Sequence, residues 1–84
     1  MNAPDRRFVY VIQSDRNRMR YIGSTSDVAR RVATHNSGGS QFTAPRRPWR
    51  VLVSVEFRSE QMALRFERYL KTGSGRAFAK RHFT

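Results

Sequence analysis

Cysteine is absent from this sequence, and long apolar runs are missing. Without cysteine the chain has no disulfide, no cysteine-ligated zinc site and no thiol nucleophile. The longest apolar run covers five residues, 8–12, and is far too short to cross a membrane. Residues 1–7 contain no apolar segment of the kind that a signal peptide requires. We therefore expect a cytoplasmic protein that has no membrane partner.

Acidic residues are also scarce. Six Asp and Glu residues stand against 17 Lys and Arg residues, which gives a formal net charge of +11. Of these cations 15 are arginine, whose planar guanidinium binds phosphate bidentately and stacks on bases. A compact Arg-rich domain indicates a polyanionic partner, above all nucleic acid, and hence a nucleoid-associated location. The alternative is a basic surface without such a partner, as in a ribosome-like structural role.

The length of 84 residues allows a single domain, 1–84, with a core of about residues 7–83. β-Branched and aromatic residues predict strands, and apolar residues at helical spacing predict helices. The expected strands are 8–12, 19–23 and 49–57, and the expected helices are 27–35, 60–71 and 76–82. The order β-β-α-β-α-α predicts an α/β fold of the α+β type, with a small three-stranded, mainly antiparallel sheet flanked by helices.

Two side-chain arrangements follow from the expected strands. If the first turn centres near Arg16, Tyr10 and Tyr21 lie nearly opposite each other on a hairpin. In the strand 49–57, alternate residues from Trp49 to Phe57 are expected to share one face of the sheet.

The first expected helix carries charged residues on its apolar stripe. The residues at i, i+3, i+4 and i+7 of this stripe are Val28, Arg31, Val32 and His35. Because Arg is almost never fully buried without a partner, we expect Arg31 to reach an anion, either a protein carboxylate or a ligand phosphate. The alternatives are an Arg31 whose charged end reaches water from the rim of the stripe, and a His35 that is a hydrogen-bonded core residue.

Glu67 is the carboxylate best placed for chemistry. The other five lie in the N-terminal segment, a turn, a helix start, a strand end and the first turn of a helix: Asp5, Asp15, Asp27, Glu56 and Glu60. Glu67 instead borders the apolar stripe of the helix 60–71. A single carboxylate with water is enough to hold Mg²⁺ in phosphoryl chemistry. The alternative is an i,i+4 ion pair with Lys71.

Two tyrosines, an arginine, a histidine and a glutamate in a domain of this charge are the groups needed to hydrolyse a phosphodiester. An arginine clamps a non-bridging oxygen, a tyrosine or histidine positions or deprotonates water, and a metal ion offsets charge on the phosphate.

These residues stand at spacings that resemble the GIY-YIG nuclease superfamily. Tyr21-Ile22-Gly23 is followed by Arg31 and His35, ten and fourteen residues after the tyrosine. The first half-motif is present as Phe8-Val9-Tyr10, and the segment 63–71 is similar to the acidic helix of the family. The resemblance runs from about residue 8 to the end, and is that of a small standalone single-domain member. Within the superfamily, the chain is similar to the N-terminal nuclease domain of the excision-repair endonuclease.

The resemblance implies an endonuclease that hydrolyses DNA with water at a single-metal site, using one Mg²⁺ or Mn²⁺ ion. It implies a structure-selective or weakly specific enzyme of the DNA-repair kind. By the same resemblance, Tyr10 and Tyr21 line the site near the attacking water, Arg31 binds the scissile phosphate, His35 positions water or phosphate, and Glu67 holds the metal. Which tyrosine acts as the general base stays open.

The chain departs from the family pattern at three places. Phe8-Val9 replaces Gly-Ile, which we expect to be harmless because only the tyrosine carries chemistry. Ser24 stands where some relatives have lysine, and no asparagine follows Glu67, so both absences bear on the rate of catalysis. The alternative is therefore a non-catalytic nucleic-acid-binding module that retains the fold. A third function, a protein-interaction adaptor, predicts no appreciable DNA affinity.

Further cations are candidates for contacts with the nucleic-acid backbone. They are Arg30, Arg46, Arg47, Arg50, Arg76, Lys80 and Arg81. Such contacts are salt-dependent and carry no sequence code, and the alternative for each is a solvated surface charge. The expected partner is DNA, with branched and single-stranded forms both open, together with a targeting protein. The expected oligomeric state is a monomer or a weak dimer.

Overall fold

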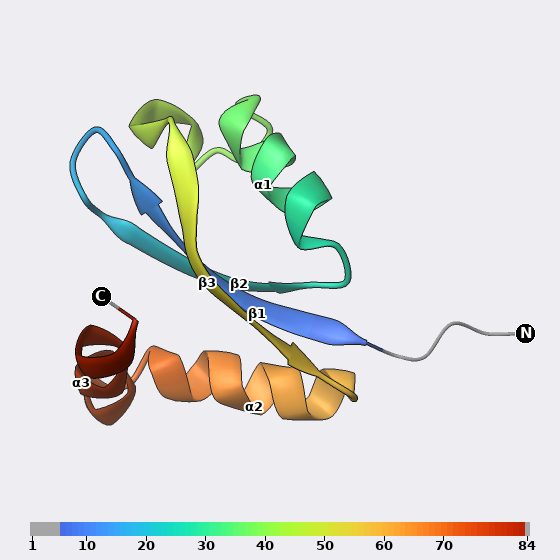
Figure 1. The fold of residues 1–84 in the computed structure, drawn as a ribbon. Coiled ribbons are helices and arrows are strands. Elements are labelled where there is room, and N and C mark those ends of the chain that lie inside the picture. Colours follow the sequence, from blue (N-terminus) through green and yellow to red (C-terminus); the bar gives the residue numbers. More distant parts are fainter. Residues whose placement is uncertain (1–5, 84) are drawn as a thin grey trace, which may run out of the picture.

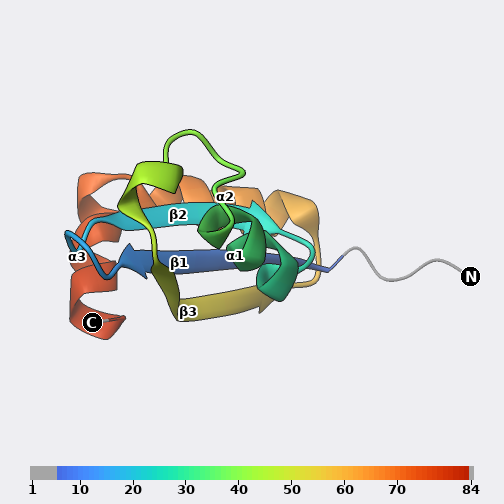
Figure 2. The same ribbon diagram turned by 90° about the horizontal axis from the view of Figure 1, so that it is seen from above.

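The computed structural model describes residues 6–83 of the chain. Its three strands, β1 (Arg7–Ser14), β2 (Arg20–Thr25) and β3 (Trp49–Phe57), form one antiparallel sheet in the order β2-β1-β3. Helix α1 (Val28–Asn36) covers one face, and α2 (Glu60–Leu70) and α3 (Gly73–His82) cover the other (Figures 1 and 2). A short 3₁₀ turn, η1 (Ala44–Arg46), precedes β3. The predicted α+β fold and its element order are confirmed.

Strand β1 is the centre of the core because both of its faces are covered. Its Val9 and Val11 pack on the α2–α3 side, in a cluster with Ala63, Leu70 and Ala79. On the α1 side, Tyr10 and Ile12 cluster with Trp49 and are covered by Tyr21, Val28 and Val32. Strand β2, in contrast, is an edge strand, so both sides of the sheet can be reached around it.

Each helix begins at a residue whose side chain accepts a backbone hydrogen bond. Asp27 caps α1, Ser59 caps α2 and Thr72 caps α3, which satisfies otherwise unpaired N–H groups of the first turn.

The third helix begins at Gly73, three residues before the predicted start. Gly75 lies so close to the carbonyl group of Tyr69 that a Cβ would collide with it, so the glycine belongs to the helix and allows α3 to fold back onto α2.

The register of the hairpin corrects one prediction. Tyr10 pairs with Gly23, and Tyr21 pairs with Ile12, so the two tyrosines are diagonal neighbours and do not lie directly opposite each other. Residues 15–19 connect the two strands, and the register centres between Arg16 and Asn17, one residue later than a pairing of Tyr10 with Tyr21 requires. Arg18 in this turn adopts a positive φ of 63°. A two-residue shift keeps both tyrosines on the same face because side chains alternate with a period of two.

A β-bulge corrects a second prediction. The ladder between β1 and β3 passes from the pair Val11–Val53 to the pair Ile12–Val51, which leaves Leu52 as an extra residue. Trp49 therefore joins the cluster on the α1 side, whereas Val53 and Phe57 pack on the α2–α3 side. The alternate residues of this strand do not share one face.

None of the helices within residues 6–83 is long and apolar enough to cross a bilayer.

Candidate active site

The hydroxyl of Tyr10 lies 2.9 Å from Nε2 of His35, and both side chains are buried. Strand β1 supplies the tyrosine, and the last turn of α1 supplies the histidine. On the other side of the imidazole, Nδ1 lies 2.8 Å from Oγ1 of Thr43, which is itself fully buried. His35 is thus a core residue with a partner at each ring nitrogen, which is the alternative that the sequence left open for it.

The direction of hydrogen bonding along this chain follows from Thr43 at one end. Arg31, near the other end, can only donate, and its electrostatic interaction with Tyr10 raises the pKa of the arginine. At the far end the hydroxyl of Thr43 donates to the carbonyl oxygen of Ser40 at 3.5 Å. The consistent assignment has Tyr10 donating to Nε2 of His35 and Nδ1–H donating to Thr43. The oxygen of Tyr10 then keeps lone-pair density for a further proton.

The pKa shifts in this chain agree with its neutral state. Burial raises the pKa of Tyr10, and the hydrogen bond from Arg31 partly offsets that rise. Burial lowers the pKa of His35, and the positive charge of Arg31 lowers it further. Hydrogen bonding to Tyr10 is the main cause that raises the pKa of Arg31. The imidazole is therefore held neutral beside a permanent cation.

Arg31 is exposed to solvent even though it belongs to the predicted inward stripe. It lines a polar cavity of about 400 Å³ at the junction of β2 and α1, together with Arg30, Asp27 and Thr25. Neither of these arginines forms an ion pair with a carboxylate among residues 6–83, although Asp27 lines the same cavity. The exposure of Arg31 fits the alternative in which its charged end reaches water from the rim of the stripe.

Tyr21 lines the same side of the sheet. Its ring lies 6.3 Å from that of Tyr10 and 5.0 Å from that of His35, measured between centroids. The exposed Phe42 covers it from the loop side, with ring centroids 6.1 Å apart. The structure thus brings together both tyrosines, the arginine and the histidine that the sequence singled out.

Gly23 explains why a glycine follows the second tyrosine. A Cβ on Gly23 would lie 2.5 Å from Oη and 2.6 Å from Cζ of Tyr10. The ring of Tyr10 therefore passes directly over the backbone of β2, and only a residue without a side chain leaves room for it. The sequence motif contains this glycine, but its steric role becomes visible only in the register of the sheet.

Glu67 comes from α2, which covers the face of the sheet opposite to α1. Its negative charge contributes to the raised pKa of Tyr10. The Glu67 carboxylate also accepts a hydrogen bond from Nζ of Lys71 at 2.9 Å, with 19% of the glutamate side chain exposed. The i,i+4 ion pair that the sequence offered as an alternative is present, and it leaves the carboxylate accessible to solvent.

The remaining described carboxylates are occupied by ordinary surface contacts. Glu56 pairs with Arg6, Glu60 with Arg7, and Asp15 with Arg50, while Asp27 caps α1. Asp5 lies outside the described residues. Among the carboxylates of residues 6–83, Glu67 is the one whose charge contributes to the raised pKa of Tyr10.

The seven predicted DNA-contacting cations do not form one patch. Arg30 lines the cavity with Arg31, whereas Arg76 and Lys80 line a cavity on the α2–α3 side. Arg46 lies over the ring of Phe42, 4.4 Å from its centroid. Arg81 is exposed near the end of α3, and Arg47 packs against Gly38.

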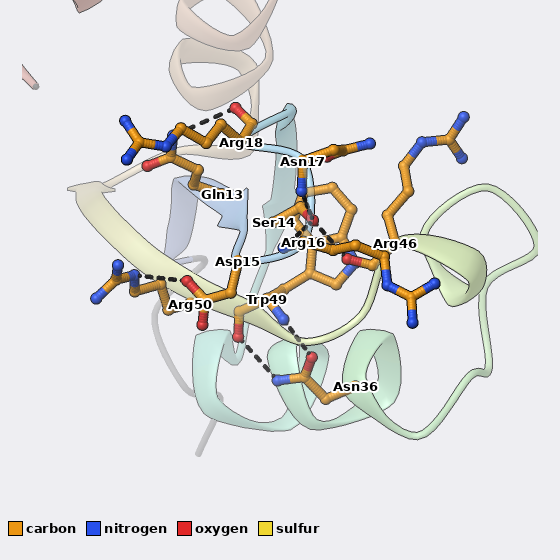
Figure 3. Close-up of polar contacts among 10 residues, drawn as sticks. All are labelled: Gln13, Ser14, Asp15, Arg16, Asn17, Arg18, Asn36, Arg46, Trp49 and Arg50. Atoms are coloured by element: carbon orange, nitrogen blue, oxygen red, sulfur yellow. Dashed lines mark hydrogen bonds and ion pairs between the residues drawn. The ribbon is translucent and has the colours of Figure 1, made fainter.

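A separate polar cluster lies at the turn between β1 and β2 (Figure 3). Arg50 bonds to Asp15 there, and both Arg50 and Arg18 extend to the same side of the turn. The side chain of Asn36 donates to the carbonyl oxygen of Trp49 and accepts from its N–H, which fastens the end of α1 to the start of β3. This clamp fixes the last turn of α1, which carries His35.

Sequence reasoning missed Thr43 and Asn36. Thr43 lies in the segment 36–48, which reads as a loop, and no local pattern marks a buried residue in it. Asn36 was predicted to end the first helix, and α1 does end there. Its hydrogen bonds to Trp49 could not be predicted because they depend on the tertiary fold.

The sequence that builds this site matches a known protein family over most of its length. Residues 6–81 match the family model described as the GIY-YIG catalytic domain. The match supports a nuclease, which is the class that the fold and the gathered residues define. The chain belongs to the GIY-YIG family.

Several relatives are small proteins named UPF0213. One from Streptococcus agalactiae is 37% identical over 79 residues, which is 89% of each chain. The protein YsiG of Lactococcus lactis is 38% identical over 65 residues, 76% of this chain and 62% of its own length. A fungal relative, the structure-specific endonuclease subunit slx1 of Emericella nidulans, is 53% identical over 53 residues, 56% of this chain and 13% of that protein.

A solved structure shares the fold. The solution structure of the UPF0213 protein BH0048 from Bacillus halodurans matches with a TM-score of 0.55 and 33% identity. The alignment covers 89% of this chain and 80% of that one.

GIY-YIG nucleases generally use a divalent metal, and the donor set here fits one hard cation. No group of three or more His, Asp or Glu residues gathers anywhere between residues 6 and 83, so Glu67 would supply one oxygen ligand and water the others. Mg²⁺ is often bound in this way, because it dehydrates reluctantly. Ser24 on β2 also has a buried hydroxyl oxygen with no hydrogen-bond partner in the described part of the chain.

Proposed function

We propose that this protein is a metal-dependent endonuclease that hydrolyses DNA phosphodiester bonds at a single-metal site, with structure-selective or weakly specific recognition. One observation carries the proposal. The Tyr10 hydroxyl is hydrogen-bonded to Nε2 of the buried His35 at 2.9 Å, and its pKa responds to the charge of Arg31 and, more weakly, to that of Glu67. A merely structural tyrosine does not need this arrangement.

In the proposed reaction, a phosphate of the DNA lies in the cavity lined by Arg30 and Arg31. The guanidinium of Arg31 binds a non-bridging oxygen and offsets the charge that develops on it. Because Arg31 also donates to Tyr10, the same contact orients the tyrosine toward the phosphate.

Water is the nucleophile. As its oxygen forms a bond to phosphorus, its proton passes to the oxygen of Tyr10, and the proton of Tyr10 passes to Nε2 of His35. The bond from phosphorus to the leaving oxygen breaks, and that oxygen takes a proton from solvent. His35, whose pKa is lowered, then returns its proton to Tyr10 while Tyr10 passes the proton gained from water to solvent, so that both side chains regain their starting state.

A divalent cation, Mg²⁺ or Mn²⁺, would be held by Glu67 and would supply Lewis-acid stabilisation of charge on the phosphate and the leaving group. Lys71 holds the same carboxylate at 2.9 Å, so it keeps Glu67 oriented and has to move aside for a metal ligand to form.

The substrate and partners are proposed on related grounds. The net charge of +11 suits DNA. The fungal relative is by name a structure-specific endonuclease subunit, which supports branched DNA as a substrate and a targeting partner protein. A cytoplasmic, nucleoid-associated location accords with such a substrate.

A second candidate function is a binding module that retains the fold without cutting. The ion pair between Glu67 and Lys71 favours it, because a carboxylate that is already paired is a weaker metal ligand.

A cleavage assay tests the two functions. Labelled single-stranded, duplex, flapped and four-way DNA would be incubated with the protein in Mg²⁺, Mn²⁺ or EDTA. The nuclease predicts products only with metal, none from Glu67→Gln, and normal products from Glu60→Gln, a matched change on the same helix. Shifted but uncut DNA from the unmodified protein would establish the binding module instead.

A further inference from the structure

A cavity of about 450 Å³ lies on the α2–α3 side of the sheet, beside the edge strand β2. Its volume is within the range of ligand pockets, about 300–1,000 Å³. The apolar residues that line it are Val11, Ile22, Leu70 and Ala79. The other lining residues are all cations: Arg20, Lys71, Arg76 and Lys80. We call this cavity the α2–α3 pocket.

The charge of the α2–α3 pocket calls for an anion. None of its lining residues is a carboxylate. Arg76 and Lys80 are exposed and stand four residues apart on α3, where like charges repel each other and destabilise the helix. Neither pairs with a carboxylate in the described part of the chain. A bound phosphate between them would relieve this repulsion.

The apolar lining shows that phosphate alone is not the whole ligand. Val11, Ile22 and Leu70 belong to or border the hydrophobic core, so the cations surround hydrocarbon surface rather than other polar groups. A nucleotide combines the two required features, because its base has apolar faces and its phosphates are anionic. A base can enter a concave pocket only when it is unpaired and out of its stack.

The α2–α3 pocket adjoins the candidate active site around the edge of the sheet. Lys71 lines the pocket and bonds to Glu67. Arg20 and Ile22 line it from β2, directly before and after Tyr21 in the chain. Lys71 therefore connects the pocket to the carboxylate that would hold the metal.

We propose that the α2–α3 pocket binds one unpaired nucleotide of the DNA strand next to the scissile phosphate. Its base lies on the apolar lining, and its phosphates contact Arg76 and Lys80. The pocket thereby selects single-stranded or flapped segments over continuous duplex. This inference rests on the proposed function only for the position of the scissile bond, since binding itself needs no cleavage.

The experiment measures binding without cleavage. Glu67→Gln protein in EDTA would be titrated with fluorescein-labelled single-stranded and duplex oligonucleotides, and anisotropy would be recorded over a range of salt concentrations. The pocket variant adds Arg76→Gln and Lys80→Gln. The matched control adds Arg65→Gln and Arg68→Gln, which remove the same charge from exposed positions on α2 outside the pocket.

We expect the pocket variant to weaken single-strand binding more than duplex binding. Losing two phosphate contacts should make the salt slope of single-strand binding shallower by about 1.4, at about 0.7 per contact. A series of oligonucleotides with one abasic position each should show a single position at which Glu67→Gln protein loses roughly fivefold in affinity, the lower end of base-stacking contributions. That loss should disappear in the pocket variant, because base and pocket then no longer act together.

Two results would overturn the inference: equal losses in the pocket variant and the matched control, or an abasic profile that the pocket variant leaves unchanged. Failure of the proposed function is visible separately, as absence of metal-dependent products from the unmodified protein. If the protein does not cut DNA but shows the abasic effect, the inference about the α2–α3 pocket stands and the proposed nuclease function is wrong.

Discussion

Gly23 lies opposite Tyr10 in the β1–β2 ladder, and a Cβ placed on Gly23 would be 2.5 Å from the tyrosine hydroxyl. The tyrosine is 1% exposed, so it has no free space into which to move. The glycine therefore sets the position of the hydroxyl that meets Arg31 and His35.

Gly23→Ala should displace Tyr10 and break its hydrogen bond to His35. We expect a loss of about 1–3 kcal/mol in the free energy of unfolding, as for other overpacked cores, together with loss of cleavage. Gly73→Ala is the control, because nothing lies within 4 Å of a Cβ there, and alanine should slightly stabilise the start of α3. Thermal unfolding and cleavage rates of the two variants provide the comparison; similar melting temperatures would contradict the steric role of Gly23.

Thr43 should act as a positioning residue for His35. Thr43→Val removes the acceptor for Nδ1–H inside the protein, and an unpaired buried donor costs about 1–3 kcal/mol. Thr43→Ser keeps the hydroxyl and should retain most of the stability and activity. Denaturant unfolding and the pH dependence of cleavage would be measured for both. If serine and valine behave alike, the hydroxyl does not hold the imidazole.

Arg31→Ala should abolish activity with little loss of stability, because the side chain is exposed and acts on the ligand phosphate. The expected fall in rate is about 10²–10³-fold, as for removal of one donor that stabilises a developing charge. Arg30→Ala, in the same cavity, should have a smaller effect because it has no link to Tyr10. A large fall in melting temperature for Arg31→Ala would show instead that this arginine is needed for the fold.

The stability of the protein should fall as the pH drops below 6.5. Burial and then Arg31 lower the pKa of His35 from its usual 6.5, so the unfolded chain takes up a proton at a higher pH than the folded chain. The unfolded state then binds more protons in this range, and the free energy of unfolding decreases as the pH falls.

Urea unfolding between about pH 7.5 and 5.5 measures this effect. The free energy of unfolding of His35→Gln should depend less on pH than that of the unmodified protein. Because both proteins contain His82, the difference between the two profiles reports on His35. Parallel profiles would show that the lowered pKa of His35 does not contribute.

Much of the fold could be predicted because the signals are local. The expected strand 49–57 has its predicted bounds, and the caps Asp27 and Ser59 stand where their side chains suit a helix start. The register and the bulge could not be predicted, because they depend on where the turn of residues 15–19 centres and on the extra residue Leu52 opposite β1. No local sequence pattern fixes these pairings, which are decided by packing between strands.

The candidate site divides in the same way. Residue types and spacing identified Tyr10, Tyr21, Arg31, His35 and Glu67, because phosphodiester chemistry needs those groups and few other residues of the chain could supply them. The tertiary structure decided that His35 is buried and bonded to Tyr10 and Thr43, and that Glu67 is paired with Lys71. Amino-acid identity fixes which groups can donate, accept or ionise, whereas packing around β1 alone decides their distances and their exposure to water.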